Sequence, residues 1–300
     1  MRLPLPVKRI VVACAATTLA VGAAGCSSPE STPAPTSSSS ATARPFDAAA
    51  LKAQLPERIR TSGTLLVGTQ VPFAPMEFEE NGKLTGFDID LVNAIARQLG
   101  LTAEVRAVGF PDLFAGVESG TFDTVAAGLS DTVEREQRVD MVSYLRAGTQ
   151  WAQRAGDAVA PHDACGVKVG AEADSVQFTL ELPAKSQACE AVGEKPLDVV
   201  GFVSDDAALT ALAAGEVDAV SADSPVIRYA AHRSDGKIVA IGKAFDTMPY
   251  ALPVAKGSPL GPILQQVVQH LIDSGEMKTL TQRWGLGGLI ETSAVNAAMN

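Results

Sequence analysis

The sequence predicts an α/β protein in which mostly parallel sheets form two similar lobes. Short apolar segments typical of strands alternate with helical patterns from residue 64 onward, which is the order of βαβ units. A weak internal repeat aligns residues 120–130 with residues 215–225, and each copy places a strand after a helix-ending glycine. The strands at 65–69 and 167–171 correspond in the same way. The alternative explanation is chance similarity between two alanine-rich segments.

The elements of the first lobe can be placed in chain order. Residues 64–69 have the apolar, β-branched composition of a short strand. Asp88 is expected to cap a helix whose apolar face runs from Leu91 to Leu99 and which stops at Gly100. The elements that follow are a strand at 104–108, a helix at 111–118 stopped by Gly120, and a strand at 124–129.

Composition excludes several classes of protein. The chain has 300 residues, of which 46% are hydrophobic, enough to bury a core in each of two lobes and too many for a disordered chain. It carries 34 acidic and 24 basic residues, a formal net charge of −10. Proteins bind nucleic acids through surfaces with clustered positive charge. Because this chain has a net negative charge, we expect no nucleic-acid partner.

The N-terminal 25 residues have the three parts of an export signal. Arg2, Lys8 and Arg9 precede an apolar run at residues 10–24, and small residues precede Cys26. The run is 15 residues long, shorter than the ~20 that span a bilayer. Residues 23–26 resemble a lipobox, which implies cleavage and acylation of Cys26, with palmitate among the acyl chains. The alternative is an ordinary signal peptide followed by an incidental cysteine.

Residues 26–45 are predicted to be a flexible tether. From Ser27 to Pro45 every residue except Glu30 and Arg44 is Ser, Thr, Pro or Ala, a composition that buries too little apolar surface to fold. An acylated cysteine followed by such a spacer implies a protein held on the outer face of the bacterial cell membrane, by more than one acyl chain.

The remaining cysteines predict one disulfide. Cys14 is removed with the signal and Cys26 is acylated, which leaves Cys165 and Cys189. Outside the cytoplasm we expect these two to pair, closing a loop of ~25 residues. The alternative is a pair of buried free thiols. The three histidines show no ligand spacing, so neither a metal nor a cofactor is expected.

Candidate ligand-binding residues follow the predicted strands of both lobes. In open α/β sheets, ligands bind beyond the carboxyl ends of the strands. The candidates at these ends are Gln70, Phe73, Phe110, Gly128, Ser130, Glu172, Ser175 and Asp223.

Several motifs resemble one known family. Residues 86–91, Gly-Phe-Asp-Ile-Asp-Leu, are similar to the signature of the bacterial extracellular solute-binding proteins of family 3, which supply polar amino acids to ABC importers. Further matching segments appear in the family's order and extend coverage from about Leu65 to Leu286: residues 72–75, 119–123, 128–135 and 214–219 with Asp223, and then Trp284-Gly285.

The resemblance implies a periplasmic-binding-protein-like fold of type II, in which two Rossmann-like lobes are joined by two crossing hinge strands. Lobe 1 is then discontinuous, comprising residues 46–148 and 247–289, and lobe 2 spans residues 149–246. Residues 290–300 form a C-terminal tail. The protein is expected to be a monomer that closes on its ligand and is read by the transmembrane subunits of a permease.

The resemblance also implies roles for the two charged candidates. Arg135 offers the α-carboxylate of an amino acid two parallel charge-assisted hydrogen bonds, supported by Ser130. The alternative for Arg135 is an ion pair with Asp131 on a solvated helix. Asp223 is expected to accept the α-ammonium group, and its alternative is a turn residue before Pro225.

The remaining candidates contact the ligand side chain in this interpretation. Phe73 and Phe110 resemble the aromatic pair that encloses the side chain in glutamine-binding relatives, and otherwise belong to the core. Glu172 and Gln70 present acceptors that favour a cationic side chain, as in arginine, lysine, ornithine or histidine. The alternatives are a neutral amide ligand such as glutamine, or surface positions for both residues.

Lobe 2 departs from the family pattern at one loop. Relatives usually have Gly-Thr or Gly-Ser where this chain has Asp174-Ser175. The Ser175 contact with the ligand is still expected, while the loop geometry stays open.

The expected function is therefore binding without catalysis. Two alternatives are kept open. One is an extracytoplasmic enzyme on the same fold, such as a cyclohexadienyl dehydratase using Glu172 as general acid, and the other is a ligand-sensing module.

Overall fold

The computed structural model of the protein describes residues 46–173 and 175–298. The predicted signal peptide at 1–25, the acylation site Cys26 and the tether at 26–45 lie outside the described residues. In the described part of the chain, no helix has the length and apolar character needed to cross a bilayer.

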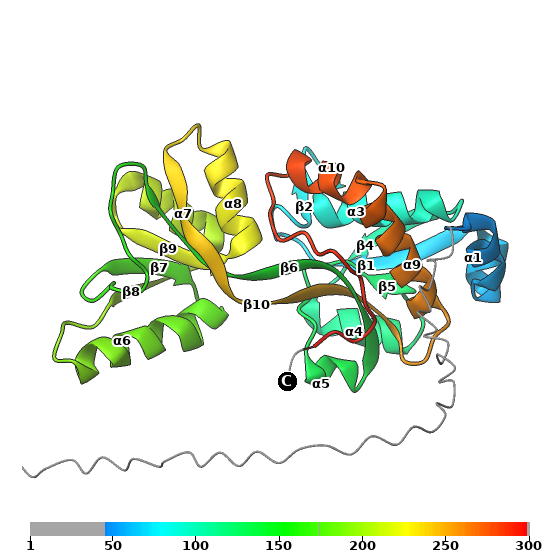
Figure 1. Ribbon diagram of the computed structural model, residues 1–300, viewed down its shortest axis with the longest axis horizontal. Helices are drawn as coiled ribbons and strands as arrows, with labels where there is room; N and C mark the ends of the chain where they lie inside the picture. Colours follow the sequence, from blue (N-terminus) through cyan, green and yellow to red (C-terminus); the bar gives the residue numbers. More distant parts are fainter. Residues whose placement is uncertain (1–45, 174, 299–300) are drawn as a thin grey trace, which may run out of the picture. The chain divides into compact units, whose positions relative to one another are not determined.

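Lobe 1 is built on a parallel three-stranded sheet with the order β4-β1-β5 (Figure 1). The central strand β1 spans Thr64–Thr69, β4 spans Thr102–Ala107, and β5 spans Thr124–Val125. A short hairpin, β2 and β3, precedes the first long helix. The remaining elements of this part are α1 (Ala48–Gln54), α2 (Glu57–Ser62), β2 (Phe78–Glu80), β3 (Lys83–Thr85), α3 (Phe87–Gln98), α4 (Phe110–Glu118), α5 (Val133–Glu136), α9 (Leu260–Asp273) and α10 (Glu276–Arg283).

Lobe 2 is built on a five-stranded sheet with the order β10-β6-β9-β7-β8. Strands β7, β8 and β9 are parallel, whereas β6 runs antiparallel to both β9 and β10. The elements are β6 (Val139–Arg154), β7 (Lys168–Glu172), a π-helical turn (Gln177–Glu181), α6 (Leu182–Ala191), β8 (Asp198–Phe202), α7 (Asp205–Ala214), β9 (Ala219–Asp223), α8 (Ser224–Arg233) and β10 (Ile238–Ala255).

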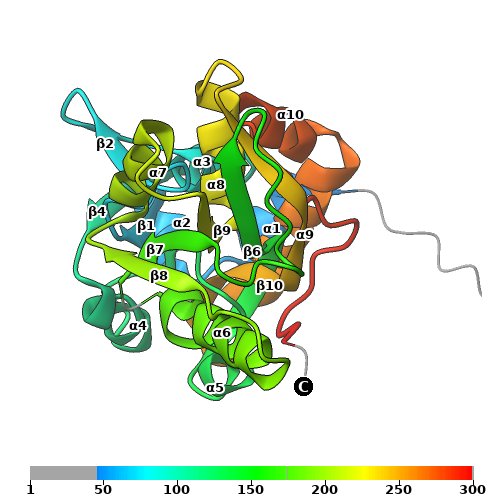
Figure 2. The same ribbon diagram turned by 90° about the vertical axis from the view of Figure 1, so that its left-hand side faces the viewer.

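The two lobes are joined by the long strands β6 and β10. Both strands run from one lobe into the other in Figure 1, and Figure 2 shows them side by side. They pair antiparallel from Val139 opposite Ala255 to Arg154 opposite Ile238, with irregular register near Phe245 and Tyr250. These strands are the two crossing hinge strands of the predicted fold.

The predicted repeat is present as a repeated topology. In lobe 1 the central strand β1 lies between β4 and β5, and in lobe 2 the strand β7 lies between β8 and β9. Both β5 and β9 follow a helix, α4 and α7 respectively. The mostly parallel arrangement is correct for these six strands, and the antiparallel pairings come from β6 and β10 and from the β2–β3 hairpin.

Two details of the predicted elements were wrong. Helix α3 is capped by Gly86 at φ 132°, where a Cβ would lie 2.2 Å from the carbonyl oxygen of Met76, so the position requires glycine. Asp88 instead lies in the first turn, where Gly128 N–H and Tyr144 Oη donate to its carboxylate. The strand predicted at 124–129 ends at Val125, and the residues after it form a loop.

The predicted apolar face of α3 is buried. Leu91, Val92, Ile95 and Leu99 are each no more than 1% exposed, and they pack in one cluster with Leu65 and other residues of β1. Burial of these side chains fixes the sheet whose carboxyl edge carries the site.

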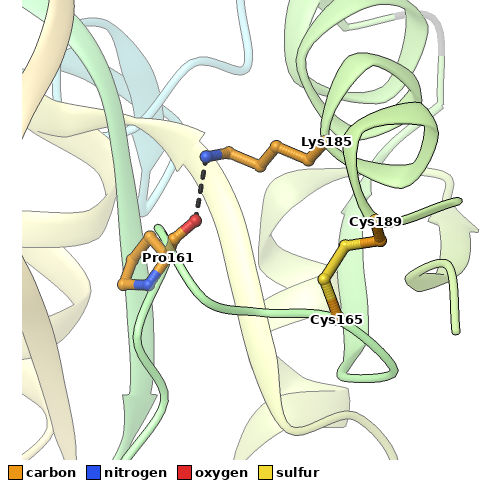
Figure 3. The surroundings of a disulfide bond; sticks show 4 residues. All are labelled: Pro161, Cys165, Lys185 and Cys189. Atoms are coloured by element: carbon orange, nitrogen blue, oxygen red, sulfur yellow. Dashed lines mark hydrogen bonds between the residues drawn. A yellow bond between two sulfur atoms is a disulfide. The ribbon is translucent and has the colours of Figure 1, made fainter. Parts of the chain in front are cut away.

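A disulfide joins Cys165, in the loop before β7, to Cys189 in α6 (Figure 3). On the same stretch of α6, Lys185 Nζ donates to the carbonyl oxygen of Pro161 over 2.9 Å, as Figure 3 also shows. The two contacts tie the loop at 161–165 to α6.

Removing this disulfide is expected to destabilise the protein. Replacing both cysteines with serine frees a loop with a sequence separation of 24 residues in the unfolded chain. The chain-entropy model gives a loss of roughly 3 kcal/mol, or ~5–10 °C in Tm for a protein of this size. Thermal unfolding of the double variant tests this. The reduced wild-type protein is the control, and its Tm should equal that of the variant. A variant as stable as the oxidised protein would contradict it.

Candidate ligand-binding site

A cavity of about 270 Å³ brings together most of the predicted site residues. It is lined mainly from lobe 1, beyond the carboxyl ends of β1 and β5, and one of its residues comes from the end of β7 in lobe 2. Its polar and aromatic lining consists of Gln70, Phe73, Glu77, Phe110, Ser130, Arg135 and Glu172, with the backbone of Gly128.

A second cavity, of about 440 Å³, shares Ser130 with the first. It contains Asp223 of lobe 2 together with Tyr250 of β10, and its lining also includes Thr149 and Gln177. The shared residue places the two cavities next to each other, so the predicted carboxylate and ammonium subsites lie in adjoining spaces.

Arg135 lies on the short helix α5 and is half-buried. Thr132 caps this helix, accepting the backbone N–H of Arg135 over 3.3 Å. The guanidinium donates through Nη1 to the carbonyl oxygen of Ser130 over 2.7 Å and lies 5.2 Å from the ring centre of Phe114. Burial lowers the pKa of Arg135. A guanidinium has five N–H donors, so donors remain for a ligand carboxylate.

The alternative interpretation of Arg135 as an ion-pair partner of Asp131 is not what the structure has. Among the described residues no direct ion pair joins the two side chains, although each charge shifts the pKa of the other, and Asp131 Oδ2 accepts the backbone N–H of Ala297 over 2.8 Å. Burial raises the pKa of Asp131 to about 7, and the neighbouring Glu136 adds to the rise.

Asp223 ends β9 and precedes α8. It makes no capping bond to α8. Gln177 Nε2 donates to its Oδ1 over 2.9 Å, and Tyr250 Oη donates to its Oδ2 over 2.5 Å. These two donors hold the carboxylate in the cavity, where it is an acceptor for a cationic group. Neither donor was predicted from the sequence.

Gly128 forms a narrow part of the site. Its backbone has φ 53°, and a Cβ there would lie 2.6 Å from Cε1 of Phe73 and 3.2 Å from Cε2 of Tyr250. Its N–H donates to Asp88 Oδ2 over 2.9 Å. The loop is therefore held by the carboxylate of Asp88 and lies close to the rings of Phe73 and Tyr250.

Replacing Gly128 with alanine is expected to lower ligand affinity at least tenfold. The added methyl group must displace the Phe73 ring, and alanine is strained at positive φ. The control is Gly120→Ala, because Gly120 has φ 76° and open space around its Cβ position, so it carries the backbone strain without the clash. Calorimetric titration with the ligand measures both. Equal affinities for the two variants would mean that the Phe73 contact is irrelevant to binding.

Lobe 2 presents a group of carboxyls at the carboxyl edge of its sheet. Burial raises the pKa of Glu172, and the carboxylates of Asp206 and Asp223 add to it. Burial also raises the pKa of Asp205 to about 7, with Glu172 and Asp223 as the next causes. Because like charges disfavour each other's ionisation, this side of the site favours a positively charged group.

Ser175 is the predicted site residue that the structure does not bring to the cavities. Its Oγ accepts the backbone N–H of Phe178 over 3.1 Å at the start of the π-helical turn, and it is absent from the linings of both cavities. Its neighbour Asp174 lies outside the described residues. The hydroxyl is used to cap the turn that carries Gln177.

Two α/β lobes joined by two strands, with a guanidinium and carboxylates facing adjoining cavities, define a two-lobed solute-binding protein of the type II fold. Residues 65–287 match the model of the bacterial extracellular solute-binding proteins, family 3, and the chain belongs to this family.

Curated and solved relatives are similar over most of the chain. The arginine-binding protein ArgT of Corynebacterium glutamicum is 34% identical over 250 residues, which cover 82% of each chain. A structure described as an ancestral cationic amino acid solute-binding protein, AncCDT-1, has a TM-score of 0.65 at 27% identity, covering 76% of this chain and 97% of that one. An ancestral arginine-binding protein bound to arginine has a TM-score of 0.56 at 32% identity, covering 74% and 98%.

Another structure of AncCDT-1 is described as a precursor of cyclohexadienyl dehydratase. It has a TM-score of 0.58 at 27% identity and covers the same shares, 76% of this chain and 97% of that one.

Proposed function

We propose that this solute-binding protein captures an amino acid with a cationic side chain and delivers it to the permease of an ABC importer. The observation that carries the proposal is the pairing of opposite charges across adjoining cavities: Arg135 of lobe 1 for the α-carboxylate and Asp223 of lobe 2 for the α-ammonium group. Charge-assisted bonds at both ends select the zwitterionic part of an amino acid.

The preference for a cationic side chain rests on the acceptors around the remaining space. Glu172 and Gln70 line the smaller cavity, and Asp205 and Asp206 lie near Glu172. Apart from Arg135, the lining of that cavity contains no basic side chain. A ligand guanidinium or ammonium group would reduce the mutual repulsion of the carboxylates, whereas a ligand carboxylate would increase it. The arginine-binding names of several relatives agree with this choice.

Ligand binding would favour the closed arrangement of the lobes. The α-carboxylate is held on α5 and the α-ammonium group on β9, so a single ligand contacts both lobes and its differential contacts shift the population toward closure. Tyr250 of the crossing strand β10 already donates to Asp223, so one site carboxylate is linked to the hinge. The permease would read the closed form.

Competition calorimetry tests the ligand class. L-arginine, L-lysine, L-ornithine and L-histidine are compared with L-glutamine and L-glutamate under identical conditions. We expect at least one cationic amino acid to bind more tightly than either comparison ligand. Tight binding of glutamate with the cationic amino acids inert would overturn the charge argument, and a preference for glutamine would remove Glu172 from the set of selecting residues.

A dehydratase is the second candidate, and the raised pKa of Glu172 is the observation that favours it. A carboxyl with a raised pKa in a cleft can serve as a general acid, and AncCDT-1 is described as a precursor of such an enzyme. We favour binding without catalysis. Incubation with prephenate or arogenate separates the two: conversion that is lost in Glu172→Gln would establish the enzyme.

A ligand-sensing module is the remaining alternative. It would bind the ligand in calorimetry but would not support uptake of that ligand in cells.

We also propose that acylation at Cys26 holds the protein on the outer face of the cell membrane as a monomer. Residues 26–45 would act as the tether, with lobe 1 at 46–148 and 247–289 and lobe 2 at 149–246. The support is the family's extracellular location and the order of the N-terminal sequence features.

Replacing Cys26 with serine is expected to release the protein from the membrane. The acyl chains, and not the 15-residue apolar run, would provide the anchor. Fractionation of cells followed by alkaline washing measures the membrane-bound share. Retention of the variant in washed membranes with an uncleaved N-terminus would identify the apolar run as the anchor.

A further inference from the structure

The segment at residues 288–298, here called the C-terminal strap, lies beyond the region matched by the family model. In Figure 1 it is the red segment that runs past β6 and ends near α5. Most of it falls in the C-terminal tail predicted at residues 290–300. In the structure, its backbone and side chains hydrogen bond with lobe 1 along its length.

The strap pairs with β6. The Arg146 N–H donates to the carbonyl oxygen of Gly288, and the Ser143 N–H donates to that of Ala294 over 2.9 Å. Val295 forms an isolated bridge with Val142. Asn296 then exchanges two bonds with Met141: its Oδ1 accepts the Met141 N–H, and its own N–H donates to the Met141 carbonyl oxygen. These bonds fix the register of the strap along the strand.

Side chains of α9 hold the strap from its other side. Gln269 contacts it twice, donating through Nε2 to the carbonyl oxygen of Glu291 and accepting the Ser293 N–H. Gln265 Nε2 donates to the carbonyl oxygen of Ser293 over 2.8 Å. Ser293 is 2% exposed, and its Oγ donates to the carbonyl oxygen of Ser143 over 2.6 Å. The strap is therefore integrated into lobe 1.

The end of the strap meets the turn that carries Arg135. The Ala297 N–H donates to Asp131 Oδ2 over 2.8 Å, and the Ala298 N–H donates to Glu136 Oε1 over 2.8 Å. Asp131 and Glu136 lie on either side of Arg135 along the chain. Two successive backbone donors thus hold the beginning and the end of the turn from which the guanidinium extends.

We propose that the C-terminal strap positions Arg135 for the α-carboxylate of the ligand, with Asp131 as the positioning residue that joins the strap to the site. Helix α5 spans four residues, and a helix of this length does not hold its own geometry. External contacts must therefore set the direction of the guanidinium. Of the side chains on this turn, Asp131 is the most deeply buried, at 3% exposed, and it receives the strap.

The inference rests on the proposed function, since it assumes that Arg135 binds the α-carboxylate. It makes a different prediction, however, because it concerns residues that do not touch the ligand. Loss of the strap contact should weaken recognition of the α-carboxylate and leave recognition of the ligand side chain unchanged. A purely structural role would weaken both together.

Three substitutions and a control separate these outcomes. Asp131→Ala removes the acceptor, and Ala297→Pro removes the donor from the other side of the same bond. Asp131→Asn keeps an acceptor oxygen of the same size and should restore wild-type behaviour. Gln137→Ala is the control, because Gln137 is an uncharged, exposed side chain at the end of the same helix without a strap contact, whereas the charge of Glu134 acts on the Arg135 guanidinium.

The measurement compares calorimetric affinities for L-arginine and agmatine, which is arginine without the α-carboxylate. We expect Asp131→Ala and Ala297→Pro to lower the arginine affinity about tenfold and to leave the agmatine affinity unchanged, while Asp131→Asn and Gln137→Ala keep the wild-type ratio. Equal losses for both ligands, or an unchanged ratio in both disrupting variants, would overturn the proposal.

A ligand-free measurement keeps the two proposals distinguishable. Amide hydrogen exchange at residues 131–136 should accelerate in Asp131→Ala and Ala297→Pro and stay as in the wild-type protein in Gln137→Ala. If wild-type protein binds no cationic amino acid, the proposed ligand class is wrong, and the exchange pattern alone decides the role of the strap. In that case, unchanged exchange in both disrupting variants would contradict the proposed positioning role of the strap.

Discussion

Replacing Arg135 with alanine is expected to remove high-affinity amino-acid binding and to leave the fold intact. Arg135 is the basic side chain that lines the smaller cavity, and its guanidinium is half-buried against the Phe114 ring. Truncating one partner of a buried charge pair costs about 2–5 kcal/mol, which corresponds to a ~30-fold to several-thousandfold loss of affinity. The loss to the fold is small, because within residues 46–173 and 175–298 the Arg135 side chain makes a single hydrogen bond, to the carbonyl oxygen of Ser130.

The matched control is Arg138→Ala. Arg138 lies three residues further on, pairs with Glu118 through Nε over 2.7 Å and Nη2 over 3.0 Å, and also lies near the Phe114 ring. It is exposed and faces neither cavity, so its loss should leave affinity unchanged. Calorimetric affinity and Tm are measured for both variants.

Asp223→Asn tests the other end of the ligand. It keeps the shape of the side chain and removes its charge, so we expect a loss of affinity within the same range. If neither Arg135→Ala nor Asp223→Asn changes affinity, the site is elsewhere. A loss in Arg138→Ala equal to that in Arg135→Ala would indicate a general effect on lobe 1.

The parts of the fold that the sequence predicted are those set by local patterns. The strand at 64–69 and the helices on either side of β4 follow from apolar periodicity and from the glycines that stop them. The long strands β6 and β10 were expected only from the family resemblance. Each strand runs through both lobes, and nothing in its composition marks where one lobe ends and the other begins. The strand β5 was predicted to be longer than it is, because the apolar composition continues beyond the strand into the loop that contains Gly128.

The site shows the same division between local and long-range information. Arg135 and Ser130 lie within one motif, and the structure places both at the same cavity. Tyr250 and Gln177 were missed because their partner, Asp223, is 27 and 46 residues away along the chain, and neither has a motif of its own. Asp88 was interpreted as a helix cap because an acidic residue before an apolar run gives the same local pattern whether it caps the helix or is buried beneath the site.

The second large effect is expected from two buried carboxyls at the site, Glu77, which lines the smaller cavity, and Asp88. They are 1% and 0% exposed, and among the described residues neither forms an ion pair. Among the described residues no other side chain or backbone group bonds to Glu77 Oε2 or Asp88 Oδ1, and the two carboxyls share a side-chain hydrogen bond. Tyr144 Oη and the Gly128 N–H both donate to Asp88 Oδ2, which favours the charged form of Asp88. Two adjacent buried carboxyls without a cation cannot both ionise at low cost, so the pair retains a proton near neutral pH.

The direction of the pH dependence follows from the pKa values in the folded state. Burial raises the pKa of Asp88 from 3.8 to about 6, and burial followed by the nearby Asp88 charge raises the pKa of Glu77 well above 4.5. The folded protein therefore binds more protons than the unfolded chain above pH ~4. The contribution of this pair to the free energy of unfolding should be largest at or below that pH and should fall as pH rises through the folded pKa values. For Asp88 alone this fall is on the order of 3 kcal/mol, because each pKa unit corresponds to about 1.4 kcal/mol.

Glu77→Gln isolates the contribution of the pair. Glutamine has the shape of the protonated glutamic acid and can donate an amide N–H to Asp88, but it has no proton to lose. We expect the Tm of the variant to fall less than that of the wild-type protein between pH 5 and pH 8, and to exceed it at pH 8 by several degrees, at ~2–4 °C per kcal/mol.

Other carboxyls do not disturb this comparison. Asp131 and Asp205, whose pKa values burial also raises to about 7, add to the fall in both proteins and cancel in the comparison. Glu79→Gln, at an exposed position on β2, is the control for the loss of one negative charge. Parallel Tm–pH curves for the wild-type protein, Glu77→Gln and Glu79→Gln would show that Glu77 carries no proton in the folded protein near neutral pH.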